Sequence, residues 1–337
     1  MGRGWTAVLA VLLLVAVARP SEAADKLRVG VLKLASSGGV FIAAERGYFT
    51  GAGVDVELRF FDAAQPIAVA AVAGDVDIGV TGLTAGFYDL AGKGALRIIA
   101  GQSREEPGYH LIAYLASNKA YSAGLAALED LPGRSIGITQ IGSTFHYSIG
   151  LLADKLRFPL ASVKLVPLQS MSNMAAALKG NQVDAALIPA TIAVPMIARD
   201  EAHELGWVGD ETPWQLGAIF ASARTVAERR AVLANFIAGY RRGARDFYET
   251  FLQRTRDGTP KAGAEQEQIL GIIAEYTGQS AERLRIGIPY VDPEAKLLVD
   301  DIHRQVAWYQ RQGLVDRSVE ANAILDLSFT GGAAAVH

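Results

Sequence analysis

The 337-residue sequence contains no cysteine. This absence excludes disulfide bonds, thiolate nucleophiles and metal sites built on cysteine ligands. It also removes the residue on which a bacterial lipoprotein carries its lipid, so we expect no lipid anchor. Basic residues form no block with aromatic residues between them, and the formal net charge is −3. Nucleic acid is therefore a poor candidate partner.

Long hydrophobic runs are also missing after residue 23. A membrane-spanning helix needs about 20 consecutive apolar residues, and no later segment reaches that length without charges. The apolar run from residue 7 to residue 18 is shorter, follows Arg3, and precedes the small residues Ser21 and Ala23. This arrangement predicts a cleaved secretory signal over residues 1–23. We expect the remaining chain to be soluble in the periplasm.

Short β-branched runs alternate with alanine-rich helical stretches through the first two thirds of the chain after the signal. Such alternation indicates an α/β fold with largely parallel sheets. The last third changes to long helical patterns over 225–254, 264–277 and 293–312. Strands are expected over 27–32, 54–60, 76–80, 98–100, 111–115, 135–139, 163–166 and 184–187, and helices between them over 39–46, 66–73, 85–91, 145–156 and 172–179.

An internal repeat relates two parts of the chain at one fixed offset. The strand and loop at 29–37 resemble those at 136–144, and the strand and loop at 77–84 resemble those at 184–191, with the same separation in both cases. Two pairs that share one offset predict two similar lobes. Loops at the carboxyl ends of parallel strands face the ligand crevice in α/β folds. We therefore expect four such loops, two from each lobe, to face one another across a cleft.

Several sequence blocks resemble one known family. The blocks are "FIAAERGYF" at 41–49 with "GVDV" at 53–56, "AGDVDIG" at 73–79, "LEDLPGRSIG" at 128–137 and "LKGNQVDA" at 178–185. Together they resemble the substrate-binding proteins of ABC importers, of the nitrate/sulfonate/taurine type. This type shares its domain with proteins that handle a pyrimidine precursor of thiamine. The resemblance covers residues 26 to 250.

The resemblance implies an α/β fold with a two-lobe periplasmic-binding-protein type II architecture, mixed and mostly parallel sheets, and a helical C-terminal tail. It places residues 24–117 and 222–337 in a discontinuous lobe 1 and residues 118–221 in lobe 2. Such lobes close on a solute like a hinge. The resemblance further implies a small-molecule solute, an ABC permease in the inner membrane as the partner, and a monomer without a cofactor.

The segment "TQIGSTFHYSIG" at 139–150 joins a predicted strand to a predicted helix and allows three interpretations. A phosphate-binding Walker loop would need a lysine after Gly142, where Ser143 and Thr144 stand. A nucleophile–base pair of Ser143 or Thr144 with His146 would join near neighbours at a helix start, which do not face each other well. We favour the wall of a solute cleft, in which Gly142 lets the backbone approach closely, a hydroxyl caps the helix, and N–H groups point at a polar or anionic group.

The predicted ligand-binding residues lie in these strand-end loops and near the second crossing between the lobes. Several have a structural alternative, since Lys33 also suits the lobe surface, the threonines also suit helix caps, and Trp214 also suits packing at the hinge. The histidines lack the spacing of a metal site, so no metal is expected. The residues are Lys33, Ser36, Ser37, Thr81, Gly82, Thr84, Gly142, Ser143, Thr144, His146, Pro189, Thr191 and Trp214.

The signal, the repeat and the family blocks together predict the solute-binding component of an ABC import system, not an enzyme. Its solute is expected to be a small organic anion, sulfonate-, nitrate- or carboxylate-like, with or without an aromatic ring. The alternative is a binding protein or a same-fold enzyme for a pyrimidine thiamine precursor, although an export signal argues against a cytoplasmic enzyme. A sensor domain that presents the same cleft to a membrane kinase is a third class.

Overall fold

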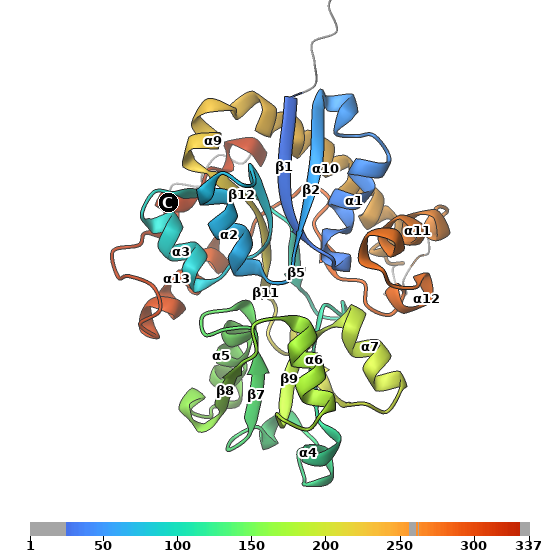
Figure 1. Ribbon diagram of the computed structural model, residues 1–337, viewed down its shortest axis with the longest axis vertical. Helices are drawn as coiled ribbons and strands as arrows, with labels where there is room; N and C mark the ends of the chain where they lie inside the picture. The colour runs from blue at the N-terminus through green and yellow to red at the C-terminus, as the bar shows by residue number, and fades with distance from the viewer. Residues whose placement is uncertain (1–24, 256–260, 262, 331–337) are drawn as a thin grey trace, which may run out of the picture.

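The computed structural model describes residues 25–255, 261 and 263–330 (Figure 1). The expected signal, residues 1–23, lies outside these residues. Within them, no helix combines the length and the apolar character that crossing a membrane requires.

Two five-stranded sheets form two lobes, drawn one above the other in Figure 1. In lobe 1 the strand order is β2-β1-β3-β12-β4, and in lobe 2 it is β10-β6-β9-β7-β8. Each sheet has one strand, β12 or β6, that runs antiparallel to both of its neighbours. The expected α/β fold with mixed, mostly parallel sheets is therefore confirmed. The strands are β1 Asp25–Leu32, β2 Val54–Phe61, β3 Ile78–Gly82, β4 Leu96–Gly101, β12 Gly217–Ser222, β6 Ile112–Ala116, β7 Ser135–Ile138, β8 Lys164–Pro167, β9 Ala185–Pro189 and β10 His203–Trp207.

The repeat is present in the pairing register of the two sheets. Val29 of β1 lies opposite Ile78 of β3, and Ile136 of β7 lies opposite Ala185 of β9, so both members of the pair shift by the same offset. A hydrogen bond from a backbone N–H to an aspartate is repeated as well. Asp77 accepts a hydrogen bond from the Arg28 N–H, and Asp184 accepts one from the Ser135 N–H, each at 2.8 Å. The same strand–loop unit is therefore built twice.

The expected domain limits, at 117/118 and 221/222, each place one strand in the lobe to which its sheet does not belong. β6 precedes the first limit but pairs within lobe 2. All of β12 except its last residue, Ser222, precedes the second limit, but this strand pairs within lobe 1. The reason is that a strand that enters a new lobe becomes the antiparallel member of its sheet. A buried apolar strand carries no mark of the sheet to which it belongs. The corrected connections between the lobes lie within 102–111 and 208–216.

A small third sheet, of order β11-β5-β13, lies on these connections. It brings together the first connection (β5 Ser103–Glu105), the second connection (β11 Trp214–Gln215) and the C-terminal region (β13 Tyr290–Val291). Figure 1 shows β5 and β11 between the two lobes. Because both connections and the tail meet here, this sheet is the structural junction of the molecule.

Helices cover the sheets, and the expected helical tail is present. A first apolar cluster lies between the lobe 1 sheet and helices α1, α10 and α11, whereas a second runs from lobe 1 through lobe 2 and includes residues of α13. The helix expected over 293–312 begins only at Val299, because Asp292 accepts the Glu294 and Lys296 N–H groups in the preceding turn. The helices are α1 Gly38–Glu45, α2 Ala64–Ala73, α3 Ala85–Gly92, α4 Asn118–Ser122, α5 Thr144–Leu156, α6 Met171–Lys179, α7 Ala190–Ala198, α8 Val208–Glu211, α9 Ala223–Glu228, α10 Arg230–Phe251, α11 Gln266–Thr277, α12 Ala281–Leu284 and α13 Val299–Arg311.

Candidate functional site

A cavity lies where the carboxyl-terminal strand ends of the two lobes meet. The space that no atom fills there, counted together with the open space at the mouth, is about 670 Å³. Both lobes and both connections contribute to its wall. The lining residues are Leu32, Leu34, Ser36, Ser37, Ala63, Ala64, Gln65, Val80, Thr81, Gly82, Thr84, Gln102, Leu111, Ile112, Thr139, Gln140, Ser143, Thr144, Phe145, Met171, Pro189 and Leu216.

Eight of the predicted binding residues line this cavity, and they come from all four of the repeated loops. The loop after β1 contributes Ser36 and Ser37, the end of β3 and the loop after it contribute three residues, the loop after β7 and the start of α5 contribute two, and the end of β9 contributes Pro189. The structure thus brings together residues that lie far apart along the chain. The residues from the β3 and β7 loops are Thr81, Gly82, Thr84, Ser143 and Thr144. Their role in binding stays a prediction.

Two hydroxyls at the cavity wall also cap helices. The Thr84 hydroxyl accepts the Phe87 N–H at 3.1 Å and donates to Gln65 Oε1. The Ser143 hydroxyl accepts the His146 N–H at 3.3 Å at the start of α5. Both residues therefore hold a helix start in place as well as lining the cavity.

Thr81 differs from the caps because its hydroxyl has no partner. The residue is only 3 % exposed, and its Oγ1 has no hydrogen bond within the described chain. Nearly all buried polar atoms in folded proteins are hydrogen-bonded, so each exception calls for an explanation. A bound solute at the cavity would supply the missing partner.

Gly142 and His146 do not line the cavity and contact each other instead. The Gly142 N–H donates to His146 Nδ1 at 3.0 Å, so this imidazole carries its proton on Nε2. Burial lowers the pKa of His146 to about 4, and the ring is therefore neutral at physiological pH. This hydrogen bond fixes the loop that precedes α5. It also occupies the Gly142 N–H and His146 Nδ1, so that neither is available to a solute.

The other three predicted residues also lie off the cavity wall. Lys33 points its ammonium over the Phe60 ring, 5.1 Å from the centroid, at the surface of lobe 1. Thr191 is buried in the first turn of α7. Trp214 lies in β11 with its ring 4.8 Å from that of Tyr147, which is the packing alternative at the hinge.

The two lobes touch directly beside the cavity. The Ala85 N–H, at the start of α3, donates to the Gly142 carbonyl of lobe 2 at 2.8 Å. A Cβ added at Gly82 would lie 2.7 Å from Thr144 Cγ2, and one added at Gly142 would lie 2.8 Å from the Ala85 Cβ. A Cβ at either position would press against a side chain of the facing lobe, so glycine permits this close contact. This contact defines a closed arrangement of the lobes.

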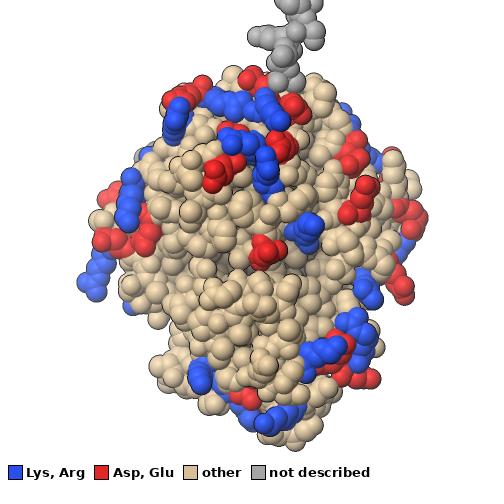
Figure 2. All heavy atoms as spheres, in the orientation of Figure 1, with Lys and Arg blue, Asp and Glu red and all other residues tan. Residues whose placement is uncertain are grey.

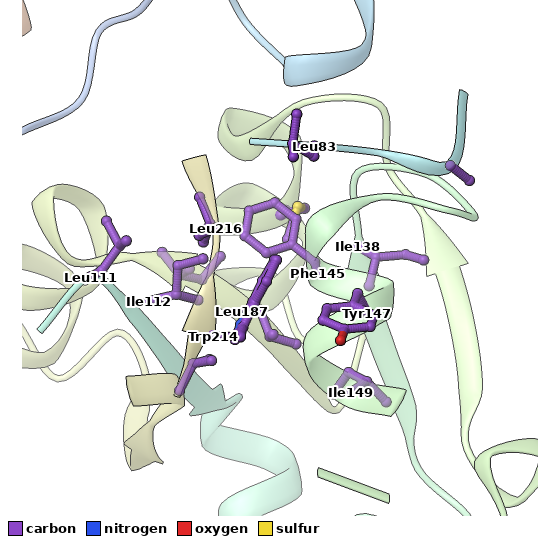
Figure 3. Packing of buried hydrophobic residues seen from close by; sticks show 14 of the residues in the cluster. Leu83, Leu111, Ile112, Ile138, Phe145, Tyr147, Ile149, Leu187, Trp214 and Leu216 are labelled. Atoms are coloured by element: carbon purple, nitrogen blue, oxygen red, sulfur yellow. The ribbon is translucent and has the colours of Figure 1, made fainter. Parts of the chain in front are cut away.

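The described residues that line the cavity include no charged side chain. Serine, threonine and glutamine supply the polar groups, while Leu111, Phe145 and Met171 represent the apolar part. Figure 3 shows Phe145 next to Leu216, with Leu83 above both. On the face in Figure 2, most charged side chains gather towards the ends and edges of the molecule, and few lie over the junction of the lobes. Within the described chain no group of acidic residues and histidines could hold a metal ion.

The profile of the NMT1/THI5-like family matches residues 35–250. The chain belongs to this family. The match begins in the loop after β1 and ends within α10, so it includes the lobe 2 sheet, the lobe 1 sheet except β1, and the four cavity loops. No curated protein sequence matches the chain.

Solved structures confirm the fold of this NMT1/THI5-like protein. It is similar to the alkanesulfonate-binding protein SsuA from Xanthomonas axonopodis pv. citri bound to MOPS, with 18 % identity, a TM-score of 0.69, and coverage of 90 % of this chain and 98 % of that chain. The periplasmic nitrate-binding protein NrtA from Synechocystis PCC 6803 matches with 13 % identity, a TM-score of 0.69, and coverage of 90 % and 87 %. The Candida albicans CA3427 gene product, described as having the generic periplasmic binding protein fold, matches with 16 % identity, a TM-score of 0.69, and coverage of 90 % and 96 %.

Several residues that line the cavity of this family member are not among the predicted binding residues. Gln102 follows the end of β4, and its Nε2 donates to the Ser36 carbonyl at 2.6 Å, which holds the first loop. Met171 follows β8 at the start of α6, and Gln65 lies at the start of α2. The position of Gln102 and Met171 after strand ends was the available sequence signal. Leu216 belongs to the second connection, for which no comparable signal exists.

Proposed function

We propose that this protein is the solute-binding component of an ABC import system. It captures a small organic anion, sulfonate-, nitrate- or carboxylate-like, between its lobes and delivers it to a permease in the inner membrane. It acts as a monomer in the periplasm, after removal of the signal. The observation that carries this proposal is the cavity formed by four repeated loops from two lobes in contact.

The chemistry of the wall favours binding over catalysis. General acid–base catalysis needs a side chain that exchanges a proton near neutral pH, and none of the described lining residues titrates there. An anion held without arginine or lysine needs N–H donors, which helix starts supply. The start of α5 lies at the cavity through Thr144 and Phe145, the first residues of a 13-residue helix. Thr81 adds an unpaired buried hydroxyl to the same wall.

A pyrimidine precursor of thiamine is the second candidate solute. Hydroxyl and amide side chains both donate and accept hydrogen bonds, so Gln65, Gln102 and Gln140 suit a neutral heterocycle as well. The apolar side chains of Phe145 and Met171 provide a surface for a flat ring. An enzyme acting on such a compound needs a titratable group at the cavity, which is why binding remains the preferred role.

Native mass spectrometry of the exported protein tests the proposal by identifying the solute that it carries. Thermal melting with nitrate, MOPS, taurine, aromatic acids and pyrimidines should then raise the melting temperature for one chemical class. Small-angle scattering should show a larger average radius without that solute than with it, because the solute raises the fraction of closed molecules. Turnover of a compound without any stabilising ligand would overturn the proposal.

A further inference from the structure

Helix α13 is attached to lobe 1 and to the junction between the lobes. The Tyr88 hydroxyl of α3 donates to Gln305 Oε1 at 2.9 Å, and Gln305 Nε2 donates to the Gln215 carbonyl at 2.8 Å. Asp301 accepts the Gln215 N–H at 2.8 Å. Figure 1 shows α13 beside α3. The helix begins well beyond the end of the matched family region at position 250, so nothing in that match assigns it a role.

The C-terminal part of α13 contacts α5 of lobe 2. The Trp308 ring lies 5.2 Å from both the His146 and the Tyr147 rings, edge to face. A Cβ added at Gly150 would lie 2.1 Å from Trp308 Cζ2, so α5 needs glycine at this point to admit the indole. The Tyr309 hydroxyl donates to the Ser143 carbonyl at 3.2 Å. Trp308 and Tyr309 thus hold the start of α5 from behind, on the side away from the cavity wall.

These contacts continue to the interface of the lobes. Trp308 packs on His146, whose Nδ1 accepts the Gly142 N–H, and the Gly142 carbonyl accepts the Ala85 N–H of lobe 1. The loop before α5 is therefore held between two elements of lobe 1, α3 on one side and α13 on the other. Because packed interiors leave little free space, a displaced indole would shift the imidazole and the loop with it.

We propose that Trp308 and Tyr309 are positioning residues for the solute site, and that α13 clasps lobe 2 in the closed arrangement. Neither residue lines the cavity. They act through His146 and Ser143, which set the position of the loop at 139–143 and of the first turn of α5. Rotation of lobe 2 away from lobe 1 has to break either the α13–α5 or the α13–α3 contact, so the clasp adds to the stability of the closed form. This inference rests on the proposed function of the cavity as a solute site.

Gly150→Ala in the full chain after signal removal is the decisive variant, with Gly271→Ala as its matched control. Both glycines lie within helices, but a Cβ at Gly271 meets nothing within 4 Å. Hydrogen exchange is measured first without any solute, at the Ala85 and Gly142 amides. We expect Gly150→Ala to speed exchange at both amides by about tenfold or more and Gly271→Ala to leave it unchanged. Unchanged exchange at both amides in Gly150→Ala would overturn the clasp.

Affinity for MOPS, nitrate or whichever panel compound stabilises the unsubstituted protein is measured next. Gly150→Ala should weaken it by about tenfold and Gly271→Ala by less than about twofold. If Gly150→Ala does not fold, Tyr309→Phe decides, because it removes only the donor to Ser143. Its control is Tyr240→Phe, since the Tyr240 hydroxyl is buried without a partner in the described chain.

Tyr309→Phe should weaken affinity by about threefold and speed exchange at Gly142, and Tyr240→Phe should do neither. Equal effects of the two tyrosine variants would overturn the clasp. Should the unsubstituted protein bind no compound, the proposed function fails, and the exchange rates alone still decide the clasp.

Discussion

Thr81→Val should change stability and affinity in opposite directions. Thr81 is 3 % exposed, lines the cavity, and has a hydroxyl without a partner in the described chain. A buried polar group left unpaired costs about 1–3 kcal/mol. Valine replaces this hydroxyl by a methyl group of similar size. We therefore expect the free energy of unfolding of the ligand-free protein to rise by about 1 kcal/mol, at the low end of that range.

The same substitution removes the donor that we assign to the solute. A hydrogen bond to a neutral group contributes about 0.5–1.5 kcal/mol and one to a charged group about 1.5–3 kcal/mol. Affinity should therefore fall by a factor between about 2 and about 150, since about 1.4 kcal/mol is tenfold. A loss at the upper end favours an anion, and a loss at the lower end favours a neutral heterocycle.

Urea unfolding of the ligand-free protein and titration calorimetry with the identified solute measure the two quantities. Thr277→Val is the matched control, because the buried Thr277 hydroxyl of α11 donates to the Ile273 carbonyl at 2.8 Å. The control should lose about 1 kcal/mol of stability and keep its affinity. The reasoning is refuted if Thr81→Val lowers stability and leaves affinity intact, because the hydroxyl would then have a structural partner.

Further predictions concern the helix cap of α5 and the dependence of stability on pH below neutrality. Thr144→Ala should weaken binding with little loss of stability, whereas Ser143→Ala should lower both, because Ser143 caps α5 and a lost cap costs about 0.5–2 kcal/mol; equal stability losses, measured by urea unfolding, would contradict this. His146 has a folded pKa of about 4, below its unfolded value of about 6.5. The unfolded state therefore binds the proton first, and stability should fall by at most about 3 kcal/mol as the pH drops from about 6.5 to about 4. His146→Gln should flatten that part of the stability curve, and an unchanged slope would show that another group titrates there.

The duplicated architecture could be predicted from sequence because each strand–loop unit has a recognisable local sequence pattern. The constant offset between the two strand–loop units reappears as identical register in the pairs β1–β3 and β7–β9. The domain limits could not be predicted, because β6 is a buried apolar strand that suits either lobe, and residues 217–222, which form β12, are not among the expected strands. Which sheet they join depends on the partner strand and not on their own residues.

The part of the site that local sequence patterns determine could also be predicted. Residues at strand ends, such as Ser36 and Thr144, line the cavity because topology alone places them there. The position of His146 and Gly142 off the cavity wall could not be predicted from sequence, because His146 packs on Trp308, which lies near the other end of the chain. Short-range spacing cannot report a contact made by the tail of the chain.

The duplication and the tail have different consequences for binding. Two similar lobes produce facing loops, but similarity alone does not favour the closed arrangement over an open one. A solute closes the lobes only by as much free energy as it gains from contacts absent in the open form. Contacts that favour closure without the solute, such as Tyr309 with Ser143, raise the fraction of molecules already competent to bind. Because apparent affinity is proportional to that fraction, the unrepeated helix α13 adjusts the affinity of a site that it never touches.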